Sequence, residues 1–82
     1  MESVRMFRTR RGMTQTELAE ASGRSKLTVS LVENGKVKPS VGTTRVFAEA
    51  LGVSVGMLLD TEEILQEREA AEKAVEEYVK AN

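Results

Sequence analysis

The sequence predicts an all-α protein, and three observations support this prediction. Apolar residues recur at spacings of three and four, the period of an amphipathic helix, in several short segments. Serine or threonine stands at the N-cap position before each of these segments, and glycine follows most of them. The one proline of the chain, Pro39, lies just ahead of a predicted helix and therefore interrupts none.

The first predicted helix runs from Val4 to Arg11, with Ser3 as its cap and Gly12 beyond its end. Its inner face is formed by Val4 and Phe7 together with Met13 just past the helix. Arginines crowd the rest of this helix, at positions 5, 8, 10 and 11. Four like charges on one short helix repel each other, so we expect them to face an anionic partner or open solvent.

The segment from Gln15 to Gly35 organises the rest of the chain, because it reads as two short helices joined by a tight turn. Thr14 is predicted to cap the first helix, and Glu17 stands three residues on, the spacing of a capping box. Leu18 and Ala19 give that helix its apolar face. The break falls at Ser22-Gly23, since glycine tolerates the left-handed conformation that ends a helix.

The second helix of this segment restarts at Ser25 as its N-cap and stops at Asn34-Gly35. Val29 and Val32, three residues apart, are predicted to face inward. The outer face then carries Lys26, Leu27, Ser30 and Leu31. A helix, a glycine turn and a helix with a polar outer face form an arrangement that can place the second helix in the major groove of DNA.

Two further helices are predicted after the polar loop that follows Asn34. Ser40 caps a helix that ends at Leu51 before Gly52, with an inner face of Val41, Thr44, Phe47, Ala48 and Leu51. Ser54 caps a last short helix, in which Met57 and either Leu58 or Leu59 close the core.

The composition changes at Thr61, which we expect to cap a separate helical extension over residues 61–82. An apolar stripe runs along this extension through Ile64, Ala71, Val75 and Tyr78, interrupted by Arg68. Such a helix needs a surface to cover its stripe. That surface belongs to the same helix of a second subunit, to the body of its own domain or to another protein.

The formal net charge of −1 hides an asymmetry between the two halves of the chain. Residues 1–46 carry nine Lys and Arg against four Asp and Glu, whereas residues 47–82 carry three against nine. A basic half suits an anionic polymer, and an acidic half is repelled by it. Small domains also segregate charge by chance, but beside the two-helix segment we favour the functional interpretation.

Several classes of function are not expected from this composition. The chain has no cysteine and no histidine, so we expect no disulfide, metal site, cofactor or usual general base. Neither a catalytic cluster nor a glycine-rich phosphate loop is present, so we do not expect an enzyme. No signal peptide and no apolar run of membrane length occurs, so we expect no membrane partner and a location in the cytoplasm.

A family resemblance rests on residues in fixed order between Val4 and Leu59. They are Gln15, Leu18, Ala19, Ser22, Gly23, Ser25, Thr28, Val29, Ser30, Val32, Glu33, Gly35, Lys36, Pro39, Ser40 and the run from Ala50 to Ser54. This set resembles the Cro/C1-type, lambda repressor-like helix-turn-helix family of bacterial and phage regulators. In size the chain is similar to Cro-like proteins, controller proteins of restriction-modification systems and helix-turn-helix antitoxins.

The resemblance implies a five-helix DNA-binding domain in residues 1–60, with its motif at 15–34. The composition adds a C-terminal helix in residues 61–82. The resemblance also implies contacts to base edges from Lys26, Leu27, Ser30 and Leu31. Phosphate contacts are expected from Gln15, Thr28, Asn34, Lys36, Lys38, Arg10 and Arg11. It also pairs Arg8 with Glu33 as a structural ion pair. Arg24 departs from the family pattern, because a small apolar residue usually packs at that place under the turn.

The function implied is that of a dimeric regulator, more often a repressor, that binds double-stranded DNA. The C-terminal stripe of Ile64, Ala71, Val75 and Tyr78 is the expected dimer contact. The alternative is a protein-binding regulator, antitoxin-like or antirepressor-like, that acts through its acidic C-terminal helix. The basic first half of the chain favours DNA binding, since a regulator that binds only proteins does not need it.

Overall fold

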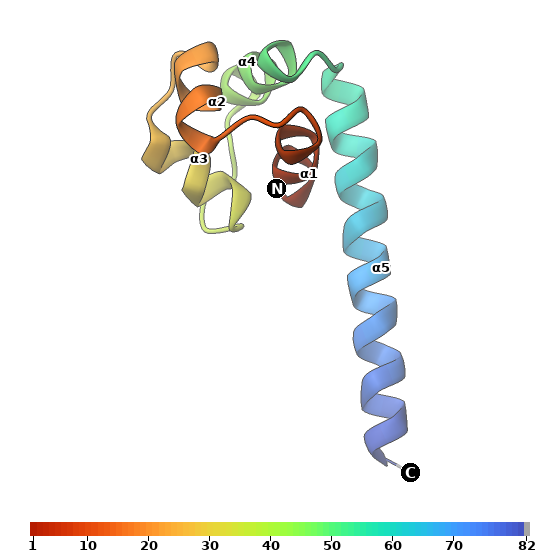
Figure 1. Cartoon of the computed structure of the whole chain (residues 1–82). Coiled ribbons are helices and arrows are strands. Elements are labelled where there is room, and N and C mark those ends of the chain that lie inside the picture. The colour runs from red at the N-terminus through yellow and green to blue at the C-terminus, as the bar shows by residue number, and fades with distance from the viewer. Residues whose placement is uncertain (82) are drawn as a thin grey trace.

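In a computed structural model, which describes residues 1–81, the chain forms five helices (Figure 1). They are α1 (Glu2–Arg10), α2 (Gln15–Ser22), α3 (Lys26–Glu33), α4 (Val41–Leu51) and α5 (Val55–Ala81). Residues 1–81 contain no strand, so the predicted all-α class is confirmed. The last residue of the predicted extension, Asn82, lies outside the described residues.

The core lies among α1 to α4 and the first turns of α5. Its apolar side chains come from all five helices, and they are Val4, Leu18, Ala19, Val29, Val32, Phe47, Ala48, Leu51 and Leu58. Thr44 is also buried, and its hydroxyl donates to Ser40 O at 2.9 Å, which satisfies its polar atom. Val41 was expected in this core but is 74% exposed as the first residue of α4.

The predicted caps of the middle helices are confirmed. Glu17 N donates to Thr14 Oγ1, and Thr14 N donates to Glu17 Oε1, each at 3.0 Å, which completes the capping box of α2. Ser25 caps α3 and Ser40 caps α4, each by accepting from the backbone N–H three residues on. Gly23 has φ +69°, as the predicted turn between α2 and α3 requires.

The predicted cap of the first helix is wrong. α1 begins at Glu2, and Ser3 lies inside its first turn and is buried. Ser3 N donates to Glu62 Oε1 at 2.9 Å, so a carboxylate of α5 binds the first turn of α1. The acceptor for this N-terminal backbone N–H is therefore a side chain 59 residues away and not the predicted Ser3 cap.

The separate helix expected to begin at Thr61 is absent, because α5 runs without a break from Val55 to Ala81. Ser54 does cap it, since Met57 N donates to Ser54 Oγ at 3.0 Å. Beyond Gly56 the helix contains neither glycine nor proline and is rich in strong helix formers, so nothing ends it at Thr61. At 27 residues it is about 40 Å long, and Figure 1 shows it projecting far beyond the other helices.

The far part of α5 does not fold back on its own domain. α5 packs against α1 and α4, but every residue from Gln66 to Ala81 is exposed. The alternative in which the body of the same domain covers the stripe is therefore wrong. None of the helices within residues 1–81 is long and apolar enough to cross a membrane.

Candidate nucleic-acid interface

The outer face of α3 carries the four side chains predicted to reach base edges. Lys26 is exposed and makes no hydrogen bond or ion pair recorded within residues 1–81, and the side chain of Leu27 is 67% exposed. Ser30 and Leu31 are half-buried one turn later. The opposite face is fixed in the core by Val29 and Val32, and the orientation of α3 therefore agrees with the prediction.

Glu33 lies at the end of α3 and is the most buried charged residue of the domain, at 1% exposure. Arg8 of α1 binds both of its oxygens, with Nε 2.6 Å from Oε2 and Nη2 2.9 Å from Oε1. Gln15 of α2 donates from Nε2 to Oε1 at 3.1 Å. Arg8 Nη1 also donates to Met13 O at 2.8 Å. This network joins α1, α2 and α3 at one carboxylate.

The pKa values of this pair follow from these contacts. Burial alone raises the pKa of Glu33, but hydrogen bonds from Arg8 and Gln15 and the charges of Arg8 and Arg5 together hold it below its ordinary value. The hydrogen bond to Glu33 raises the pKa of Arg8 against the opposing effect of its burial. Both groups are therefore charged at neutral pH, and the ion pair is maintained.

The C-terminal end of α3 is held by a second arginine of α1. Arg5 Nη2 donates to Asn34 Oδ1 at 2.5 Å, and Arg5 Nε lies 3.7 Å from Glu33 Oε1. Asn34 Nδ2 in turn donates to Ser30 O at 2.9 Å. The side chain of Asn34, predicted to bind a phosphate, is thus already engaged at both of its polar atoms. Arg5 was expected with the other arginines to face an anionic partner or open solvent, but its i, i+3 spacing with Arg8 places both on the face of α1 that meets Glu33 and Asn34.

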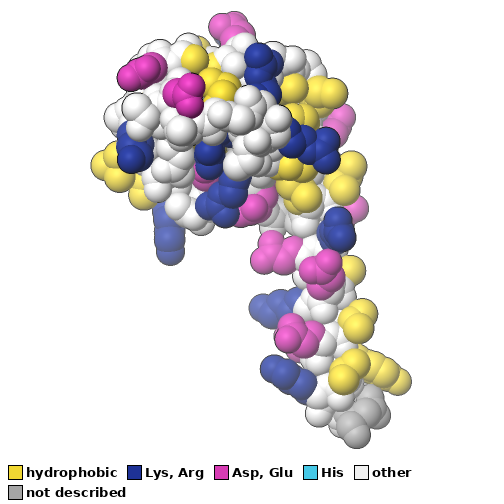
Figure 2. Space-filling model, viewed as in Figure 1, with side chains coloured by type: hydrophobic (Ala, Val, Ile, Leu, Met, Phe, Trp, Pro, Cys, Tyr) yellow, Lys and Arg dark blue, Asp and Glu magenta, His cyan; other side chains and the backbone are white. Residues whose placement is uncertain are grey.

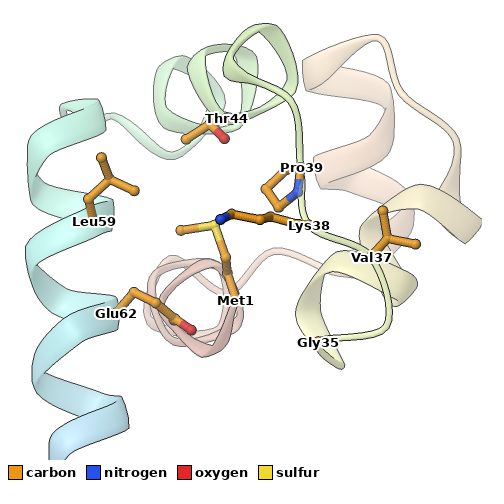
Figure 3. A pocket seen from close by; sticks show the side chains of 8 residues that line it. All are labelled: Met1, Gly35, Val37, Lys38, Pro39, Thr44, Leu59 and Glu62. Carbon is orange, nitrogen blue, oxygen red and sulfur yellow. The ribbon is translucent and has the colours of Figure 1, made fainter.

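The other residues predicted to bind phosphates lie in different environments. Gln15 opens α2 and is half-buried beside Glu33, and Thr28 Oγ1 shares a hydrogen bond with Ser25 Oγ at 2.9 Å. Lys36 is exposed in the loop after α3. Lys38 is exposed as well, but its side chain points toward a cavity of about 330 Å³ between α1, α4, α5 and this loop (Figure 3).

Arg10 and Arg11 do not flank α3, contrary to the expectation from the sequence. Arg11 Nη1 donates to Leu51 O at 2.8 Å and so binds the C-terminal end of α4. The N-terminal end of α4 lies next to the turn before α3, because Arg24 in that turn binds Thr43. The two ends of α4 are about 15 Å apart, so Arg11 at the C-terminal end is remote from the start of α3. Arg10 is exposed and lies about 200° around α1 from Arg8, which binds Glu33 of α3.

The four residues of the predicted dimer contact are exposed along the projecting part of α5. Ile64 is 63% exposed, Val75 62% and Tyr78 71%, and Ala71 is exposed between them. Figure 2 shows hydrophobic side chains along one edge of this part of α5 and charged side chains along the other. Arg68 Nε lies 3.3 Å from Glu72 Oε1, so the residue that interrupts the stripe is paired within its own helix.

The sequence of residues 2–60 matches the helix-turn-helix domain family, and the match covers most of the chain. The chain belongs to the Cro/C1-type helix-turn-helix family of DNA-binding regulators. It is similar in structure to the clp gene regulator ClgR from Corynebacterium glutamicum, with 32% identity and a TM-score of 0.86 over 90% of this chain and 79% of that one. A second crystal structure of ClgR gives 38% identity and a TM-score of 0.68 over 71% and 75% of the two chains.

The chain is also similar in sequence to the immunity repressor protein of Bacillus phage phi105. It is 29% identical over 76 residues, which are 93% of this chain and 53% of the repressor. The chain thus spans about half the length of that relative.

In helix-turn-helix proteins the second helix of the motif is the recognition helix and the first crosses the DNA backbone, and α3 and α2 hold these two positions in this chain. One residue of the turn between these two helices was not among the site residues predicted from the sequence. Arg24, in the turn between α2 and α3, donates from Nε to Thr43 Oγ1 at 3.1 Å and so bridges the motif to α4. The sequence signal was its departure from the apolar residue usual at this place, but its partner lies 19 residues away and has no local signature.

Proposed function

We propose that this chain is a sequence-specific repressor that binds a pseudo-palindromic operator in double-stranded DNA as a dimer. The observation that carries the proposal is the outer face of α3. Lys26 and Leu27 stand exposed there on a helix whose inner face is fixed by Val29, Val32 and the Glu33 network. A rigid helix with exposed side chains at its N-terminal end is what major-groove recognition requires.

The exposed residues of α3 differ in what they offer a base pair. Lys26 can donate to guanine O6 or N7, and the side chain of Leu27 can pack on a thymine methyl group. Ser30 and Leu31 are half-buried, so their contacts are expected at the edge of the site. Asn34 Nδ2 already lies 3.4 Å from Ser30 Oγ, which leaves this hydroxyl less available than that of a free serine.

Phosphate contacts fix the register of such a helix on the duplex. Gln15 at the first turn of α2, Thr28 on α3 and the exposed Lys36 support this role by their positions next to the motif. Arg10 and Arg11 leave the set because they lie away from α3. Asn34 is proposed to bind a phosphate only through its backbone, because its side chain is already hydrogen-bonded to Arg5 and to Ser30 O.

Two features support the proposed dimer, the small DNA interface of a single domain and the exposed apolar stripe of α5. One domain offers one recognition helix, whereas a two-fold dimer presents two helices about 34 Å apart, one turn of DNA. The exposed stripe of Ile64, Ala71, Val75 and Tyr78 supports α5 as the contact between the subunits. Repression needs only occupancy of a promoter, so it requires no further surface.

The test is selection of bound duplexes from a random DNA pool at about 0.1 M salt, where specific and salt-dependent binding can be separated. The expected result is an enriched inverted repeat whose half-sites lie about one helical turn apart. Absence of enrichment contradicts the proposal.

The second candidate function is then favoured, a regulator that binds a protein through α5. Its support is the exposed apolar stripe of α5, in a segment whose residues 61–82 carry seven Glu against three Lys and Arg. In that case the projecting part of α5 is the segment with which to search for the partner.

A further inference from the structure

Arg24 occupies an unusual place in the turn between α2 and α3. Its backbone N–H donates to Ala19 O at 3.0 Å, directly after Gly23 with its positive φ, so the turn fixes where the side chain leaves the backbone. The side chain is half-buried, and its Nε donates to Thr43 Oγ1 at 3.1 Å. The aliphatic stem thus fills the place under the turn, and the guanidinium emerges beside the first turn of α4.

The acceptor of this hydrogen bond is itself held in place. Ser40 caps α4 by accepting from Thr43 N at 3.1 Å, and Ser40 Oγ donates to Thr43 Oγ1 at 3.1 Å. Thr43 Oγ1 therefore has a fixed position and offers its remaining lone pair to Arg24. No other hydrogen bond or ion pair to this guanidinium is recorded among residues 1–81.

The internal stability of the domain does not account for a charge at this place. No carboxylate is paired with Arg24 among residues 1–81, unlike Arg5 and Arg8, which both lie near Glu33. The guanidinium also lies beside the N-terminal turn of α4, where the helix dipole disfavours a cation. An apolar side chain would fill the space under the turn without this electrostatic cost.

We infer that Arg24 binds a phosphate of the DNA backbone and that Thr43 positions it, an inference that rests on the proposed function. Arg24 directly precedes Ser25, the N-cap of α3, and the N-terminal residues of a recognition helix are those that enter the major groove. The groove is about 12 Å wide and is bordered by phosphates on both sides. A residue one position before the N-cap therefore lies at the phosphate border, and the free Nη groups present the planar fork that binds a phosphate.

The test compares two variants that remove the same charge. Arg24→Gln removes the proposed contact. Arg45→Gln removes an exposed arginine on α4 about 200° around the helix from Thr43. Affinity for one fixed duplex is measured by fluorescence anisotropy between 0.05 and 0.2 M salt.

One lost phosphate contact is expected to lower the slope of log affinity against log salt by about 0.9 for each protomer bound. The ratio of parent affinity to Arg24→Gln affinity then falls about 3.5-fold between 0.05 and 0.2 M salt for each contact. Arg45→Gln is expected to keep the parent slope. Equal slopes for the two variants would overturn the inference.

Two more variants test whether Arg24 acts on DNA binding or on folding, and whether Thr43 positions it. Arg24→Val restores an apolar side chain under the turn, so its melting temperature should equal or exceed that of the parent while its salt slope falls as in Arg24→Gln. Thr43→Val keeps the charge of Arg24 but removes its anchor, and it should weaken binding without the full loss of slope. A parent-like slope in Arg24→Val assigns the residue a structural role and overturns the inference.

The parent chain itself distinguishes the two proposals. If it binds no duplex in a salt-dependent way, the proposed function and this inference fail together. If it binds and the variants at Arg24 match the parent, only the inference about Arg24 fails.

Discussion

Arg8 holds both oxygens of the Glu33 carboxylate, with Nε 2.6 Å from Oε2 and Nη2 2.9 Å from Oε1. Because one residue lies on α1 and the other at the end of α3, this pair joins α3 to the first helix of the chain. Glu33 is 1% exposed, so its charge is compensated within the protein and not by water.

Arg8→Met should therefore destabilise the domain strongly. It retains an apolar stem but leaves a buried carboxylate without its main partner, and the loss of unfolding free energy should be about 3 kcal/mol. Urea denaturation measures this loss. The control is Arg68→Met, since the pair of Arg68 with Glu72 is exposed on both sides and should be worth less than about 0.5 kcal/mol. Equal losses in the two variants would show that the Arg8 pair is not a special contact.

The pH dependence of stability should report the same carboxylate. The pKa of Glu33 is held below its ordinary value near 4.5, so its contribution is complete above that value and is lost as the pH falls through the lowered pKa. The raised pKa of Arg8 lies on the far alkaline side and adds nothing in this range. The urea midpoint of the parent chain should therefore fall between pH 5 and pH 3.

Glu33→Gln is the matched variant for this measurement, and its urea midpoint should fall less over the same pH range. A part of the dependence should remain, because the hydrogen bond from Thr14 N lowers the pKa of Glu17 in both proteins. Curves of identical slope would mean that Glu33 is not the group that titrates.

Lys26→Ala should weaken binding at the selected operator by about 1 to 3 kcal/mol and relax the preference at one base pair. The reason is that Lys26 is exposed at the start of α3, where a side chain can reach a base edge. Lys73→Ala removes the same charge on α5, remote from α3, and should change neither quantity. Binding by competition against single-base variants of the operator measures both effects. An unchanged preference in Lys26→Ala would contradict the assignment of the recognition helix.

Lys36→Ala and Lys38→Ala should behave differently, although both residues lie in the loop after α3. Lys36 is exposed, and its loss should weaken all duplexes alike and reduce the salt slope by about one unit. Lys38 is exposed too, but its side chain points toward the cavity between α1 and α5, so its removal should reduce the slope less than the removal of Lys36. Salt titrations on one duplex of unrelated sequence decide the matter. A larger effect from Lys38 would place its ammonium group on the DNA side.

Local signals in the sequence were sufficient for the helices of the motif. Thr14, Ser25 and Ser40 cap their helices through the third backbone N–H ahead, and a contact of this range can be read directly from residue spacing. Val29 and Val32 are buried because a helix period assigns them to one face. The pairing of Arg8 with Glu33 followed from the family resemblance, since nothing in their spacing indicates it.

The contacts that the sequence did not indicate join residues far apart in the chain. Glu62 binds Ser3 N, Arg11 binds Leu51 O and Arg24 binds Thr43, and each depends on how two helices pack together. The long α5 was missed for another reason. A good N-cap residue such as Thr61 predicts a helix start only where the preceding chain stops being helical, and the four residues before it continue the helix.

Val75→Glu should dissociate the proposed dimer, because it places a charge in the middle of the apolar stripe of α5. Val75 is 62% exposed in the single chain, so the variant should fold as well as the parent, with the same helical circular dichroism. Light scattering coupled to size-exclusion chromatography should then show half the parent mass, and operator affinity should fall with it. Ala70→Glu adds the same charge to α5 off the stripe and should leave the mass unchanged. A parent-like mass in Val75→Glu would remove the stripe from the dimer contact and favour a partner protein on α5.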